Sequence, residues 1–149
     1  MNGKPFLNIS TSVEETIKLG EKLVRELPSQ SIIALRGDLG VGKTHFVKGI
    51  AKGMGISDTI TSPTYNLYNL YQSINRGMLL HLDAYRLENQ ADAEDLLLED
   101  FLGAEYVLVI EWPEKIIQWI PENCIWIEIK IIENKRRLLQ TSPPKTSLI

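Results

Sequence analysis

The sequence predicts a three-layer α/β fold, in which helices cover both faces of a central, mostly parallel β-sheet that also carries an antiparallel hairpin. Three observations support this prediction. An apolar run at 31–36 leads into a glycine-rich loop and then into apolar residues at helical spacing from 46 to 54. Segments of strand and helix character alternate along the rest of the chain. The segment YVLVIE (106–111) is apolar up to its last residue, as in a strand buried inside a parallel sheet.

The first helix is expected in the segment STSVEETIKLGEKLVRELP (10–28), where Pro28 ends it. Ser12 followed by Glu15 has the pattern of a capping box at the start of a helix. Its apolar face is expected to comprise Val13, Ile17, Leu23 with Val24, and Leu27.

The middle of the chain is expected to form a hairpin and two further helices. YNLYNLY (65–71) and MLLHLD (78–83) have strand character, and the turn residues in QSINRG join them. The acidic segment 91–102 predicts a helix, and Pro113 stands where proline is favoured in a first helical turn.

The last strand is expected at 125–132, with RRLLQ (136–140) as its candidate partner. We expect one domain over residues 1–140 and a flexible C-terminal tail over 141–149.

Bulk composition indicates a soluble, globular protein. The chain has 149 residues, 44% of them hydrophobic and 23% charged, and a net charge of −3, which argues against a broad nucleic-acid-binding face. Cys124 is the only cysteine, so no internal disulfide is possible, and we expect a small core residue in a reducing compartment. We find no apolar signal core and no run of membrane-spanning length, so a cytoplasmic location is expected.

The glycine-rich loop RGDLGVGKTHF (36–46) fits the P-loop pattern G-x-x-x-x-G-K-[ST]. A side chain at Gly37 or Gly42 would obstruct the turn or the approach of a phosphate to the backbone N–H groups. Lys43 supplies positive charge to the β- and γ-phosphates, the Thr44 hydroxyl is placed to bind Mg²⁺, and the helix start adds its positive dipole end. The phosphate-binding residues expected from the motif are Gly37, Asp38, Leu39, Gly40, Val41, Gly42, Lys43, Thr44 and His45.

Two apolar runs end in a carboxylate. Asp83 ends MLLHLD and Glu111 ends YVLVIE, and ligands of open α/β sheets bind at the carboxyl ends of the strands. We therefore expect Asp83 on Mg²⁺, directly or through water, and Glu111 on Mg²⁺ or on the attacking water. The alternative is that both are solvated strand ends. His81 alternates inward and is expected in the core or beside the site, and Trp112 is expected in the core or at the rim of the site.

The segment TSPTY (61–65) carries three hydroxyls around a proline. Thr61, Ser62 and Thr64 are candidates to donate to a γ-phosphate or to bind Mg²⁺, as switch loops do, and a simple turn before a strand is the alternative. Arg86 either stabilises transition-state charge or pairs with the acidic helix.

The segments GDLGVGKT, TSPTY, HLDAYRL and EWPEK occur in the order and spacing of the TsaE (YjeE) family of bacterial P-loop ATPases, which the chain resembles from about residue 10 to 139. Val41 and His45 depart from the alanine and threonine that are commonest at these positions. The resemblance implies a small ATPase that takes part in the synthesis of threonylcarbamoyladenosine at position 37 of tRNA. It also implies action on a TsaD–TsaB protein pair, with tRNA reached only through that complex and no membrane involved.

Residue by residue, the resemblance implies ATP and Mg²⁺ as ligands. Lys43 and Thr44 match the phosphate and Mg²⁺ residues of the family. Asp83 and Glu111 match its two essential acids, so the expected catalytic residues are these two and Lys43. Trp112 completes the EW pair, and the three hydroxyls of TSPTY match the switch-like loop.

Other nucleotide-dependent functions compete with this interpretation. A small-molecule kinase would need an acceptor pocket and usually an arginine-bearing lid, and no lid insert is visible. A GTPase would need an N-K-x-D motif, but NKRR (134–137) has arginine in place of aspartate. A nucleotide-gated binding module without turnover would use the same residues, and only kinetics separates it from an ATPase.

Overall fold

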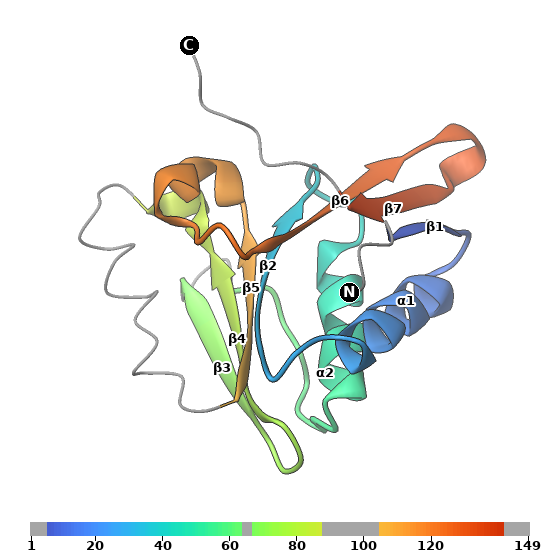
Figure 1. The fold of residues 1–149 in the computed structure, drawn as a ribbon. Coiled ribbons are helices and arrows are strands. Elements are labelled where there is room, and N and C mark those ends of the chain that lie inside the picture. The colour runs from blue at the N-terminus through green and yellow to red at the C-terminus, as the bar shows by residue number, and fades with distance from the viewer. Residues whose placement is uncertain (1–5, 64–66, 88–104, 142–149) are drawn as a thin grey trace.

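A single seven-stranded sheet organises the molecule, which we describe from a computed structural model over residues 6–63, 67–87 and 105–141. The strand order is β1-β7-β6-β2-β5-β4-β3 (Figure 1). The strands are β1 Leu7–Ser10, β2 Gln30–Arg36, β3 Tyr68–Ser73, β4 Gly77–Asp83, β5 Tyr106–Glu111, β6 Ile125–Ile131 and β7 Arg137–Thr141.

The centre of the sheet is parallel and both sides are antiparallel. β6, β2, β5 and β4 run in one direction, while β3 pairs antiparallel with β4, and β7 pairs antiparallel with β6 and β1. All six residues of β5 are buried, as its continuous apolar pattern predicts. The predicted α/β class, with a parallel centre and an added hairpin, is confirmed. In consequence, four strands end at the same edge of the sheet.

Helices α1 (Val13–Arg25) and α2 (Lys43–Gly53) lie together on one face of the sheet (Figure 1). The predicted apolar side chains of α2 are buried in the larger hydrophobic core: Phe46, Val47, Ile50, Ala51 and Met54. Glycines allow the two helices to approach closely. A Cβ atom at Gly20 would lie 2.2 Å from the carbonyl oxygen of Phe46, and one at Gly49 would lie 1.9 Å from that of Ile17.

The apolar face predicted for α1 is partly wrong. Val13 is 39% exposed and Ile17 is half-buried, whereas Thr16 and Gly20 are buried. The reason is that the glycine contact with α2, and not hydrophobicity alone, sets the rotation of the helix.

The start of α1 follows the predicted cap with one change. The Ser12 hydroxyl accepts a hydrogen bond of 3.1 Å from the backbone N–H of Glu15, as expected. The Glu15 carboxylate, however, accepts from the backbone N–H of Thr11 (2.6 Å), one residue before the position that a capping box requires. The hydrogen bonds that the Glu15 carboxylate accepts from the backbone N–H and from the hydroxyl of Thr11 lower the pKa of this carboxyl.

Short 3₁₀ helices that follow β4 and β5 pack on the other face of the sheet, near the carboxyl ends of these strands (Figure 1). They are η1 (Ala84–Arg86) and η2 (Pro113–Trp119), while η3 (Glu133–Lys135) lies in the β6–β7 turn. Pro113 begins η2 as predicted, but the segment is not α-helical and is kinked at Ile116, where φ is −132°. A second, smaller core fills the space between η2 and the sheet, and half-buried Cys124 packs against it.

Several boundaries differ from the sequence prediction. β3 begins at Tyr68, and β7 includes Thr141, which pairs with Ile127 and so belongs to the sheet instead of the expected tail. β1 was not predicted at all. The acidic segment 91–102, Thr64 and residues 142–149 lie outside the described residues. None of the described helices is both long enough and apolar enough to cross a membrane.

Candidate functional site

The loop between β2 and α2 has the backbone that the P-loop motif requires. Gly40 and Gly42 have φ values of 83° and 108°, in the left-handed region that only glycine adopts without strain. A Cβ atom at Gly37 would lie 2.7 Å from Cγ2 of Val41 and 2.9 Å from the carbonyl oxygen of Ile129. Both motif glycines are therefore needed for the shape of the loop.

Lys43 lies across this loop. Its side chain is nearly buried, and its Nζ donates a hydrogen bond of 2.6 Å to the carbonyl oxygen of Gly37. The same Nζ lies 4.5 Å from the centroid of the Trp112 ring, a cation–π distance. The ammonium group is thus held at the mouth of the loop, where an anionic oxygen can replace the Gly37 carbonyl as its acceptor.

The two predicted carboxylates lie at neighbouring strand ends, beside the loop. Asp83 of β4 and Leu35 of β2 both pair with Glu111 of β5. Because paired residues of parallel strands point to the same face, both acids point to the face on which Leu35 packs in the larger core against α1 and α2. This is also the face from which α2 and its Lys43 rise. The phosphate loop and the ends of β4 and β5, which are far apart in the sequence, therefore meet at one edge of the sheet.

Both acids are buried, with exposed fractions of 8% for Asp83 and 3% for Glu111. Asp83 Oδ1 accepts a hydrogen bond of 2.9 Å from the backbone N–H of Tyr85. Among the described residues, neither acid forms an ion pair with lysine or arginine, and only His81 approaches, with its Nε2 3.5 Å from Glu111 Oε2. Buried carboxylates without a basic partner favour a bound cation. The two carboxylates and the Thr44 hydroxyl, in the first turn of α2, are oxygen donors of the kind that Mg²⁺ prefers.

Within the described part of the chain, no three His, Cys, Asp or Glu side chains gather to hold a metal by themselves.

The ring of Trp112, which lies beside Lys43, packs against a second aromatic ring. Trp112 has a left-handed backbone with φ 57°, and its ring lies 5.2 Å from that of Tyr85. Lys115 Nζ lies 5.2 Å from the centroid of the Tyr85 ring. The loops that follow β4 and β5 thus contact each other through their aromatic rings.

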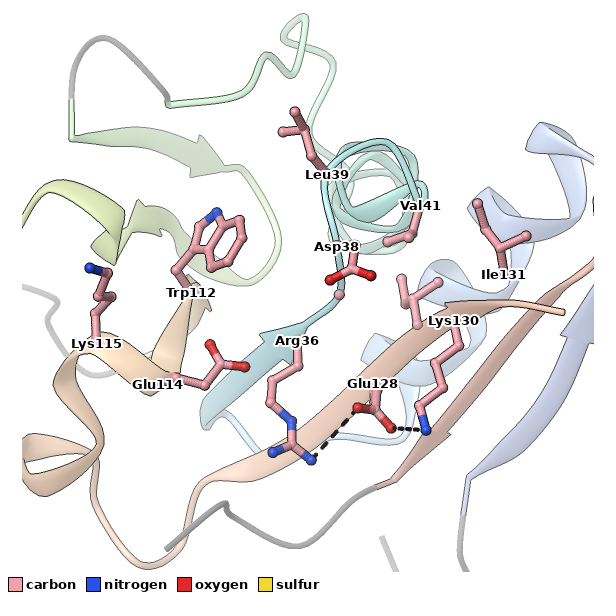
Figure 2. A pocket seen from close by; sticks show the side chains of 12 residues that line it. Arg36, Asp38, Leu39, Val41, Trp112, Glu114, Lys115, Glu128, Lys130 and Ile131 are labelled. Carbon is pink, nitrogen blue, oxygen red and sulfur yellow. Dashed lines mark ion pairs between the residues drawn. The ribbon is translucent and has the colours of Figure 1, made fainter. Parts of the chain in front are cut away.

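A cleft of about 810 Å³ opens beside the loop (Figure 2). Its charged floor is formed by β2 and β6, where Glu128 lies 4.0 Å from Arg36 and 3.3 Å from Lys130. Figure 2 shows Trp112 on one side of the cleft and Leu39, 89% exposed, at the tip of the loop. We did not predict this cleft, although the alternating polar residues of β6 are a sequence signal for it.

The family model described as "Threonylcarbamoyl adenosine biosynthesis protein TsaE" matches residues 10–139. The chain belongs to the TsaE family. This confirms the resemblance seen in the sequence motifs.

Individual TsaE proteins are similar over most of their length. The one from Treponema pallidum is 36% identical over 129 residues, covering 87% of this chain and 94% of the relative. The one from Aquifex aeolicus is 38% identical over 134 residues, covering 87% and 91%. A crystal structure of YdiB from Bacillus subtilis matches the fold with a TM-score of 0.77 and 25% identity, covering 95% of this chain and 86% of that one.

The remaining residues implied by the TsaE resemblance differ in their exposure and in their contacts. Thr44 and His45 are half-buried in the first turn of α2. Thr61 and Ser62 are exposed, and the backbone of Thr61 is hydrogen-bonded to β3 through the Tyr71 hydroxyl (3.4 Å) and the Asn69 amide (3.2 Å). In this structure the Thr61 backbone is thus hydrogen-bonded to side chains of β3.

Proposed function

We propose that this chain binds ATP with Mg²⁺ at the loop 37–44, hydrolyses it weakly, and serves as an accessory protein in the modification of tRNA to N6-threonylcarbamoyladenosine at position 37. The observation that carries the proposal is the meeting of Lys43, Asp83 and Glu111 at one edge of the sheet. The names of the family model and of its relatives supply the pathway.

Each residue has a distinct role in this proposal. Lys43 exchanges its bond to the Gly37 carbonyl for the β- and γ-phosphate oxygens. Thr44 and Asp83 hold the Mg²⁺, which when bound neutralises charge developing on the phosphates. Glu111 orients and deprotonates the attacking water, and the His81 imidazole, whose Nε2 lies 3.5 Å from Glu111 Oε2, positions that carboxylate.

The setting of the reaction is also part of the proposal. The chain acts as one ATPase domain in the cytoplasm. The protein acts on the TsaD–TsaB pair and reaches tRNA only through that complex. Thr61 and Ser62 belong to a segment that moves toward the γ-phosphate when the partner docks; in this structure the Thr61 backbone is hydrogen-bonded to β3 instead.

Calorimetric titration with ATP and Mg²⁺ tests the binding step. We expect Lys43→Ala to lose at least about tenfold in affinity, the scale of a charge-assisted hydrogen bond to phosphate. Lys52→Ala is the matched control, because it removes the same charge from the exposed last turn of the same helix. Unchanged affinity in Lys43→Ala would remove the basis of the proposal. Pull-down of TsaD and TsaB with ATP and with ADP then tests the partner assignment, and we expect stronger retention with ATP.

A further inference from the structure

The side chain of Arg137 reaches the phosphate loop from the far end of the chain. Arg137 is the first residue of β7, where it pairs with Ile131 of β6 and Ser10 of β1. Its Nε–H donates a hydrogen bond of 2.6 Å to the carbonyl oxygen of Val41, 96 residues earlier. The side chain is half-buried, so this bond is partly shielded from water.

The side chain of Arg137 also lies directly against Gly42. A Cβ atom at Gly42 would lie 3.2 Å from Arg137 Nε, closer than most real Cβ contacts, and 3.5 Å from its Cδ, an ordinary van der Waals distance. Since Gly42 also has φ 108°, glycine at this position serves two purposes. It permits the turn, and it leaves room for the guanidinium group beside the backbone.

This hydrogen bond fixes the orientation of one peptide group. The C=O of Val41 and the N–H of Gly42 belong to the same planar, trans peptide and therefore point in opposite directions. Arg137 holds the oxygen on the β7 side of the loop. The Gly42 N–H is thereby directed to the other side, into the loop, where backbone donors bind phosphate.

The charge of Arg137 is available to the same loop. In the described part of the chain, Arg137 forms no ion pair with a carboxylate. An arginine side chain stays protonated at all physiological pH values, so it adds a fixed positive charge beside the loop.

We propose that Arg137 is a positioning residue for nucleotide binding, which holds the Val41–Gly42 peptide so that the Gly42 N–H donates to a phosphate oxygen. This inference rests on the proposed function, because it assigns a role at the same phosphate loop. It adds a residue from the last strand to a site whose other parts come from β2, β4, β5 and α2.

Two substitutions separate the hydrogen bond from the bulk of the side chain. In Arg137→Gln, the amide nitrogen is bonded to Cδ and so occupies the place of Nε as a neutral N–H donor. In Arg137→Met, a methyl group occupies that place and nothing donates to Val41. With ADP and Mg²⁺ in calorimetry of the full chain, we expect Arg137→Met to bind about tenfold to a hundredfold more weakly, and Arg137→Gln to recover most of that loss.

The neighbouring Arg136 provides a matched control. Its Nε donates to the carbonyl oxygen of Glu133 within the β6–β7 turn, away from the loop. Arg136→Met changes the net charge and side-chain shape in the same way, and we expect its ADP affinity to stay within about twofold of the unmodified chain.

The Gly42 amide signal in a ¹H–¹⁵N spectrum gives a readout that a purely structural role would not move. We expect added ADP to shift this signal in the unmodified chain and in Arg137→Gln, and to leave it nearly unmoved in Arg137→Met. Unchanged ADP affinity in Arg137→Met would overturn the inference. A Gly42 signal that does not shift when ADP is added to the unmodified chain would also overturn the inference. This second result does not depend on whether Arg137→Met folds.

The Lys43→Ala variant separates this inference from the proposed function. If Lys43→Ala loses affinity while Arg137→Met does not, only the role of Arg137 fails. If neither substitution lowers the affinity, the phosphate loop is not the nucleotide site and both proposals fail.

Discussion

Substitution of Gly49 by alanine tests how α2, and with it the phosphate loop, is seated on α1. A Cβ atom at Gly49 would lie 1.9 Å from the carbonyl oxygen and 2.8 Å from the carbonyl carbon of Ile17, and 3.0 Å from the backbone nitrogen of Glu21. All three atoms belong to the backbone of α1, so no side-chain rotation can relieve the overlap. The helices must move apart.

The structure determines the sign and scale of the effect. Real Cβ contacts are essentially never under 3.0 Å, so the 1.9 Å contact requires a separation of more than about 1 Å. Such overpacking costs about 1–3 kcal/mol or more, whereas alanine gains about 1 kcal/mol in helix propensity over glycine. The two helices share the larger core, so the cost at this close contact should fall at the upper end. We expect a net loss of about 2 kcal/mol, which lowers the Tm by about 4–8 °C in a chain of this size.

Thermal unfolding followed by circular dichroism measures this change. Gly53→Ala is the matched control, because its Cβ atom would first meet a side-chain atom, Cγ1 of Val24 at 2.3 Å, and its nearest backbone atom, Glu21 O, would lie at 2.9 Å instead of 1.9 Å. We expect a smaller loss there. A Tm that rises in Gly49→Ala, as helix propensity alone predicts, would refute the close approach of the two helices.

Three further predictions concern ionisable side chains. Asp83→Asn and Glu111→Gln should keep the fold but lower ATP turnover at least about a hundredfold, which is the scale for losing a metal-holding or acid–base group. Near-normal turnover in either variant would show that the substituted residue is a solvated strand end without a catalytic role. Burial raises the pKa of the Cys124 thiol from 9.0 to about 12. The native thiol should therefore react with iodoacetamide at pH 8 at least about a hundredfold more slowly than in urea, and equal rates would contradict its burial. The Glu15 carboxyl has a lowered pKa in the folded chain, so its contribution to stability is complete above the unfolded value of 4.5 and disappears as the pH falls through the folded value. Accordingly, Glu15→Gln should lower the Tm at pH 7, and this deficit should shrink as the pH falls below 4.5. A Tm deficit that stays constant as the pH is lowered would show that the carboxylate is not the cause.

Local patterns predicted the parts of the fold that local physics determines. The strand, loop and helix at 31–54 were predictable, because apolar periodicity marks the strand and the helix and the spacing of the glycines is the spacing that a phosphate-binding loop needs. The meeting of Asp83 and Glu111 was predictable too, because parallel strands end at one edge of a sheet.

Contacts between distant segments could not be predicted in this way. β1 has only four residues and no clear alternation, and it is a strand because β7, more than 120 residues later, pairs with it. Arg137 reaches Val41 for the same reason. Pro113 indicated a helix start correctly, but tertiary packing of Ile116 converts the segment into a kinked 3₁₀ turn.

The most direct test of the proposed function is a steady-state ATPase assay on the purified chain, alone and with saturating TsaD and TsaB. In this structure the Thr61 backbone is hydrogen-bonded to β3, and under the proposed function the docked partner brings this segment to the γ-phosphate. We expect slow turnover alone and a stimulation of at least about tenfold by the pair, since an externally supplied or ordered group is worth up to roughly 10³–10⁵ in such sites. No stimulation, together with equal partner affinity in the ATP and ADP states, would contradict the account.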